Sequence, residues 1–137
     1  MAKVRLVPEE EARGLVKEVY DDILSSRGLA RVPNFWRALA NHPEYLAATW
    51  TKLKVVMADG ALDRKTKEMV AVAVSATNSC DYCIDSHIDT LRSLGTTDRE
   101  LMELMAVVDF FNGSNATASG LKVEYEPPVP ASTDAGK

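Results

Sequence analysis

The feature that most constrains the fold is the stretch from Glu68 to His87, which holds both cysteines of the chain and one of its two histidines. After Val70 its first half is apolar or small at nearly every position, so a helix there should be central and covered on most sides. If Cys80 and Cys83 begin the next helix, their Cα atoms lie about 5 Å apart, inside the roughly 4.4–6.8 Å that a disulfide spans. His87 then lies one turn further along the same face. A dithiol beside an imidazole indicates a redox site.

Length and composition are those of one globular domain. The chain has 137 residues, a hydrophobic fraction of 46% and a charged fraction of 26%, enough to bury a core. The net charge is −4 with both signs mixed throughout, which predicts no nucleic-acid partner. The longest apolar run, Met69 to Val74, is too short to cross a membrane. The N-terminus has no apolar signal segment, so we expect a cytoplasmic, reducing location where a C-x-x-C pair is catalytic or metal-binding.

The rest of the chain predicts helices joined by short links, and hence an all-α fold. Proline, glycine and capping residues bound expected helices at residues 8–25, 34–40, 43 to the stop at Asp59-Gly60, 64–77, 80–94 and from 97 onward. After residue 7 no stretch alternates convincingly with a period of two. We therefore predict a single compact domain of six to seven helices over residues 1–126, followed by a proline-rich tail at residues 127–137.

Two parts of this pattern predict which side chains are buried. The last helix, opened by a capping box between Thr97 and Glu100, is expected to turn five residues inward: Leu101, Leu104, Met105, Val108 and Phe111. The Asn-Gly-Ser-Asn at residues 112–115 either ends or kinks that helix. In the first half of the chain, three aromatic residues are expected in the core: Phe35, Trp36 and Trp50.

Both cysteines are candidate nucleophiles. Cys80 lies closest to the start of its helix, where backbone dipoles lower a thiol pKa. Cys83 has His87 one turn away, and the imidazole can take its proton. Two other interpretations stay open. The three side chains could hold zinc, with His42 or an acid as fourth ligand, or the thiols could be a buried inert pair.

Glu68 is the acid that could serve the same site. Helical spacing aligns it with Val72 and Ser75, on the side that should face the partner helix. A carboxylate there would be partly buried, and burial raises a carboxyl pKa toward the range of a general base. Glu68 could also be the last solvated charge before the apolar run, so the spacing alone leaves both roles open.

Taken together, these residues resemble a known family. The pattern Glu-x11-Cys-x2-Cys-x3-His from Glu68 to His87 resembles the signature of alkylhydroperoxidase D-like proteins in the carboxymuconolactone decarboxylase superfamily. The segments Val32-Pro33-Asn34-Phe35 and His42-Pro43-Glu44 resemble that family's helix links, so the likeness covers roughly residues 8–127. It implies an all-helical subunit that assembles as trimers or hexamers and needs no cofactor of its own.

The resemblance also implies roles for the four site residues. Cys83 would attack the peroxide, Cys80 would resolve the intermediate, and Glu68 with His87 would form the proton relay that activates Cys83. Tyr82 stands where the best-studied branch has a second histidine, which resembles a wider peroxidase-related branch.

The expected function is reduction of a hydroperoxide, or of a partner disulfide, in an antioxidant role. The Cys80–Cys83 pair would cycle between dithiol and disulfide, with electrons from an external dithiol such as a lipoyl or thioredoxin-like protein. A decarboxylase, as in the other arm of the superfamily, and a non-enzymatic redox sensor are the alternatives. The dithiol argues against the decarboxylase, whose chemistry does not require it.

The apolar residues also predict assembly. The helix at 64–77 is apolar nearly all round. The chain also has many large aromatic side chains for its length, among them Trp36, Trp50, Phe110 and Phe111. A lone helical domain of this size would expose apolar surface, so we expect a homo-oligomer.

Overall fold

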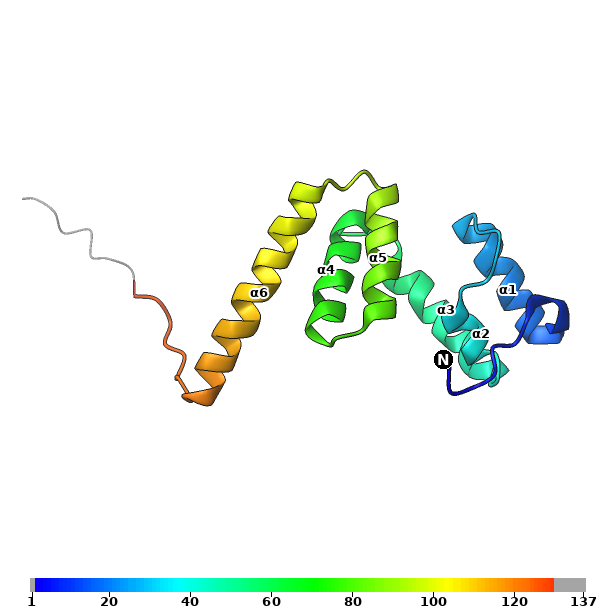
Figure 1. Cartoon of the computed structure of the whole chain (residues 1–137), viewed down its shortest axis with the longest axis horizontal. Helices are drawn as coiled ribbons and strands as arrows, with labels where there is room; N and C mark the ends of the chain where they lie inside the picture. The colour runs from blue at the N-terminus through cyan, green and yellow to red at the C-terminus, as the bar shows by residue number, and fades with distance from the viewer. Residues whose placement is uncertain (1, 130–137) are drawn as a thin grey trace, which may run out of the picture. The chain divides into compact units, whose positions relative to one another are not determined.

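The computed structural model describes residues 2–129 and contains no strand in that range, which confirms the predicted all-α class (Figure 1). Its elements are a 3₁₀ helix η1 (Glu9–Glu11) and six α-helices: α1 (Gly14–Arg27), α2 (Asn34–Leu39), α3 (Pro43–Met57), α4 (Arg64–Thr77), α5 (Asp81–Ser93) and α6 (Asp98–Gly120). No helix in the described range is long and apolar enough to cross a membrane. Most of the predicted tail, residues 130–137, lies outside that range, and the boundary at residue 126 stays a prediction.

The chain divides into two compact units, an N-terminal unit ending at Arg64 and a C-terminal unit beginning at Lys65. The N-terminal unit contains η1, α1, α2 and α3. The C-terminal unit contains α5, α6 and, apart from its first residue, α4.

The first α-helix begins later than the sequence predicts. Residues 9–11 form only a 3₁₀ turn, and α1 starts at Gly14 with a φ of +50° rather than at Pro8. Between the two elements Ala12 is buried in the core, at 3% exposure. The Glu9 carboxylate also accepts the N–H of Val32 at 2.8 Å. These contacts with distant residues turn the chain before the helix can start.

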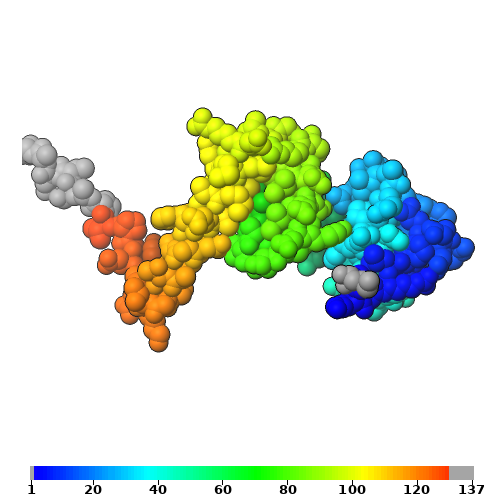
Figure 2. Space-filling model, viewed as in Figure 1, coloured from blue at the N-terminus to red at the C-terminus, as the bar shows by residue number. Residues whose placement is uncertain are grey.

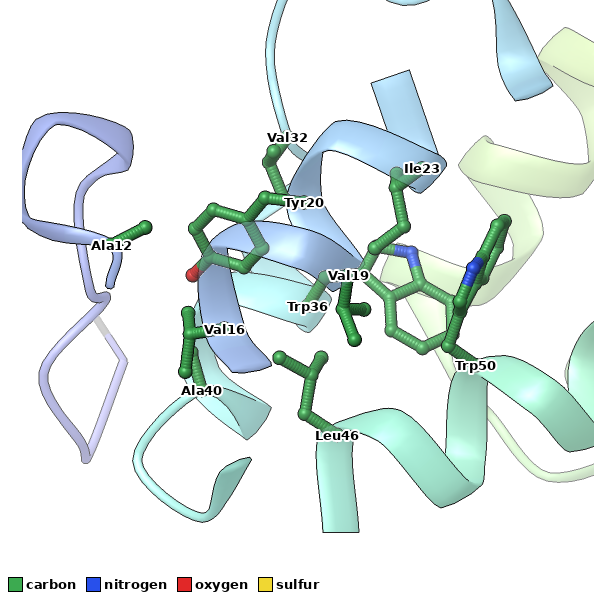
Figure 3. Close-up of a cluster of buried hydrophobic side chains, with 10 residues drawn as sticks. All are labelled: Ala12, Val16, Val19, Tyr20, Ile23, Val32, Trp36, Ala40, Leu46 and Trp50. Carbon is green, nitrogen blue, oxygen red and sulfur yellow. The ribbon is translucent and has the colours of Figure 1, made fainter. Parts of the chain in front are cut away.

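The N-terminal unit closes a hydrophobic core around α1, α2 and α3 (Figure 3). The rings of Trp36 and Trp50 meet nearly at right angles, with centroids 5.2 Å apart. The core is completed by eight further buried residues: Ala12, Val16, Val19, Tyr20, Ile23, Val32, Ala40 and Leu46. The sequence prediction holds for both tryptophans and is wrong for Phe35, which is 45% exposed and forms a T-shaped ring pair with Trp36.

One carboxylate ties α1 to α3 at the edge of this core. Asp22 Oδ2 accepts both the indole N–H of Trp50 at 2.7 Å and the Lys54 ammonium at 2.6 Å. The bond from Lys54, and then that from Trp50, hold the pKa of Asp22 below its usual value. The Lys54 ammonium also lies 5.5 Å from the centroid of the Trp50 ring. The indole is therefore fixed from its edge and its face.

In the C-terminal unit α4 runs antiparallel to α5 and parallel to α6 (Figure 1). Between α4 and α6, Lys65 pairs with Glu100 at the start and Thr77 with Asn112 twelve residues on. The predicted capping box at the start of α6 is present, and α6 continues as a helix through residues 112–115.

Many apolar side chains of the C-terminal unit that were expected to be buried are exposed. Val70 and Val74 of α4 are both 53% exposed. The prediction that this helix is covered on most sides is therefore wrong for a single copy of the chain. On α6, Val108 is buried as predicted, whereas Met105 and Phe111 are 36% and 54% exposed. Three helices cannot enclose every apolar face that the sequence provides. Figure 2 shows the last turns of α6 projecting beyond α4 and α5.

Candidate active site

The cysteine pair sits at the first turn of α5. The backbone N–H of Cys80 donates to the carbonyl of Ser75 at 3.0 Å, which brings the chain back after α4. Cys80 occupies the N-cap position, and the N–H of Cys83 donates to its carbonyl at 3.0 Å. A disulfide joins the two residues, whose Cα atoms are 5.3 Å apart. The structure therefore describes the oxidised form of the pair.

Glu68 and His87 meet across α4 and α5. His87 Nδ1 lies 2.6 Å from Glu68 Oε2, within hydrogen-bonding distance. Glu68 is 1% exposed, so it is not the solvated charge that the sequence also allowed. The His87 side chain keeps 29% exposure. A buried carboxylate is costly unless it is paired, and here the imidazole provides the partner.

The contact orients the imidazole. An ionised carboxylate can only accept, so with Glu68 ionised the Nδ1–H of His87 would donate to it and Nε2 would carry the free lone pair. Because Nδ1 faces a buried group and the side chain is partly exposed, Nε2 would then be the nitrogen available for proton exchange. His87 lies one helical turn after Cys83, the spacing at which side chains of a helix are neighbours.

All four predicted site residues thus belong to one helical pair: Cys80 at the N-cap of α5, Cys83 and His87 on its first two turns, and Glu68 on α4. His42, the possible fourth zinc ligand, instead caps α3, where its Nδ1 accepts the N–H of Tyr45 at 3.3 Å. Within residues 2–129 no group of three histidine, cysteine or acidic side chains is placed to hold a metal ion. Tyr82, between the cysteines, is 47% exposed.

One supporting contact was not predicted from the sequence. Lys65, one turn before Glu68, donates to Glu100 Oε1 at 2.6 Å, while Glu100 Oε2 accepts the N–H of Thr97. The bond from Lys65, followed by those from Thr97, lowers the pKa of Glu100 to about 2. The capping box identified Glu100 only as a local cap. The cap uses only one of the two carboxylate oxygens of Glu100, and the other oxygen, free to accept a further bond, was the signal for a partner on another helix.

Comparison with known proteins agrees with the helical fold. The family model described as the carboxymuconolactone decarboxylase family matches residues 43–123. The crystal structure of an alkylhydroperoxidase D core from Rhodospirillum rubrum is 40% identical, with a TM-score of 0.88 over 92% of this chain and 95% of that one. The helical fold implied by the family signature is therefore confirmed.

Two curated relatives match over unequal lengths. An alkyl hydroperoxide reductase of Mycobacterium tuberculosis is 31% identical over 93% of this chain but only 38% of its own length. An uncharacterised protein of the cox locus of Paracoccus denitrificans is 46% identical over 39% of this chain and 49% of its own. The chain thus spans about half, or less, of the curated relatives it matches. On the family match and the shared core structure, it belongs to the carboxymuconolactone decarboxylase family, as an alkylhydroperoxidase D-like member.

Proposed function

We propose that this protein is a thiol-dependent peroxidase, or a disulfide reductase, in which Cys80 and Cys83 cycle between dithiol and disulfide. The observation that carries the proposal is the disulfide at the first turn of α5, on the same helix as an imidazole held by a buried carboxylate. The names of the relatives, an alkylhydroperoxidase D core and an alkyl hydroperoxide reductase, support a peroxidase-type oxidoreductase.

In the proposed cycle the Cys83 thiolate attacks the distal oxygen of a hydroperoxide. The O–O bond breaks, the alcohol leaves after taking a proton, and Cys83 becomes a sulfenic acid. The Cys80 thiol then attacks that sulfur, releasing water and forming the disulfide. An external dithiol of the lipoyl or thioredoxin type returns both sulfurs to thiols and is itself oxidised. We place this cycle in the reducing cytoplasm, in an antioxidant role.

Glu68 and His87 would supply the base. Nε2 of His87 would take the Cys83 proton, while the buried Glu68 holds Nδ1–H and stabilises the imidazolium that forms. Cys83 is preferred to Cys80 as the attacking thiol because of this base. Cys80, at the N-cap, is left as the resolving thiol.

The test is consumption of cumene hydroperoxide by the full chain, with dihydrolipoamide or a reduced thioredoxin as donor. Wild type should turn over, Cys83→Ser should not, and Cys80→Ser should react once and stop at the sulfenic acid. If Cys80 instead proves to be the fast-reacting thiol, the two roles must be exchanged. Reduction of a partner disulfide without peroxide consumption would identify a disulfide reductase.

Two other functions are the alternatives to this proposal. The family description names a decarboxylase, and such an activity would persist when both cysteines are replaced by serine. A redox sensor would form the same disulfide but show no turnover with any donor. Turnover in the donor assay therefore identifies the peroxidase or reductase, and activity that persists without either cysteine distinguishes the decarboxylase from the sensor.

We further propose that the protein works as a homo-oligomer, a trimer or a hexamer. Its support is the apolar surface of α6, where four large hydrophobic side chains are more than half exposed: Met102, Val107, Phe110 and Phe111, at 67%, 56%, 65% and 54%. Monomers rarely leave such a surface uncovered.

A further inference from the structure

The N-terminal unit contains a second feature that the redox chemistry does not use. A cavity of about 170 Å³ lies between the end of α1 and the end of α3. This volume is below the roughly 300–1,000 Å³ of pockets for drug-sized ligands, so a ligand here would be small. None of the lining residues belongs to the cysteine site.

The lining combines basic and apolar side chains. Three of its eight residues are cations, Arg27, Lys54 and Arg64, and none is acidic. Its apolar wall consists of Trp50, Leu53 and Met57. Such a lining combines a site for an anionic group with apolar surface for the rest of the ligand.

The cations are not equivalent. The charge of Lys54 is balanced by Asp22, which it contacts at 2.6 Å. Arg27 is half-buried, and in the described part of the chain its guanidinium has no hydrogen-bond or ion-pair partner. Its place in the last turn of α1 suits the helix dipole. The interaction with the helix dipole leaves all five N–H donors of the Arg27 guanidinium available for a ligand.

Trp50 makes the apolar wall rigid. Its indole N–H is held by Asp22 and its ring adjoins Trp36, so the face toward the cavity keeps one orientation. A ligand would bind against a surface that is already ordered, which lowers the entropic cost of binding.

We propose that this cavity binds a small carboxylate carrying a short apolar chain. The carboxylate pairs with the Arg27 guanidinium in a two-point contact, and the chain lies against Trp50, Leu53 and Met57. The site is independent of the proposed redox cycle, because it needs neither cysteine.

The probe is hexanoate, titrated into the ¹⁵N-labelled full chain while the Trp50 indole N–H and the arginine Nε–H signals are followed. We expect a saturable shift of the Trp50 signal. Arg27→Gln should weaken binding about tenfold, the loss of one charge-assisted contact. Arg31→Gln, an exposed arginine that does not line the cavity, should bind like wild type.

Ligand comparisons on wild type test the same idea without a variant. Hexanol keeps the chain and lacks the charge, whereas acetate keeps the charge and lacks the chain, so both should bind more weakly than hexanoate. Equal binding of hexanol would overturn the role of Arg27, and equal binding of acetate would overturn that of the apolar wall. A Trp50 signal that does not move with hexanoate would overturn the site. Near-ultraviolet circular dichroism of Arg27→Gln, matching wild type, establishes that the variant is folded.

Discussion

The two units of the chain differ in how much of their apolar surface they bury. The N-terminal unit buries ten residues in one core around two tryptophans. Between residues 65 and 129 only three hydrophobic side chains are buried, Val72, Leu91 and Val108, while the unit also buries the charged Glu68. The C-terminal unit contains the candidate redox residues and leaves much of its apolar surface exposed. From this comparison we predict that the N-terminal unit provides most of the stability, whereas the proposed reactivity and self-association would belong to the C-terminal unit.

The largest effect should come from the core of the N-terminal unit. Ile23 is fully buried, so Ile23→Ala leaves a cavity and should lower the free energy of unfolding by about 2–5 kcal/mol. Denaturant unfolding followed by tryptophan fluorescence measures it, since both tryptophans lie in this unit. Leu15→Ala, on the same helix but 39% exposed, is the control and should cost less. A changed Cys83 alkylation rate in folded Ile23→Ala would break the proposed separation of roles.

The second effect is on the chemistry of the C-terminal unit. Glu68→Gln keeps the shape but removes the negative charge beside His87, so the Cys83 thiolate should form only at higher pH. Turnover should fall on the order of 10²-fold. The measurement is the alkylation rate of each cysteine in reduced protein against pH. Asp85→Asn, an exposed acid on α5, should leave the profile unchanged. If the Cys83 profile does not move in Glu68→Gln, the carboxylate is structural and the relay is wrong.

A third prediction addresses the exposed surface. Phe110→Ser should weaken self-association about tenfold or more, because buried aromatics dominate interface energies. Light scattering across a dilution series would show the shift to smaller species. Val4→Ser removes an exposed side chain of the N-terminal unit, at 55%, and should leave the mass unchanged. A monomer mass for wild type at micromolar concentration would contradict the assembly itself.

The smallest effect concerns the bond between α4 and α6. The pKa of Glu100 is lowered to about 2, below its unfolded value near 4.5, so its stabilisation is present above pH 4.5 and lost as the pH falls through 2. Glu100→Gln should therefore lower the melting temperature slightly at pH 7, and the difference from wild type should shrink toward pH 2. Glu103→Gln, on the exposed face of the same helix, is the control. A difference that does not depend on pH would show that the cap, and not the charge, matters.

Local signals account for what the sequence predicted well. The boundaries of α3, α4 and α5 follow from proline, glycine and capping residues, and the capping box placed the start of α6. The start of α1 was missed because it depends on the burial of Ala12 and on a bond between Glu9 and Val32, residues far apart in sequence. Periodicity identified apolar faces on α4 and α6, but it carries no information on what covers them.

The candidate site shows the same limit. The cysteine spacing predicts a Cα separation of about 5 Å from helix geometry alone. Whether Glu68 is buried depended on α4 and α5 packing side by side, which places it against His87 nineteen residues away. Which cysteine reacts first stays a prediction, since spacing and backbone position favour different sulfurs.

The position of the disulfide has a consequence for α5 itself. In the described structure no side chain caps the start of this helix, unlike α6 with its capping box. The covalent bond instead closes the first turn, from the N-cap residue Cys80 to Cys83. Adding two electrons to the sulfurs removes this closure, so each redox cycle would also release and re-form one end of a helix. The amide protons of that turn are therefore expected to exchange faster with solvent in the reduced protein than in the oxidised one.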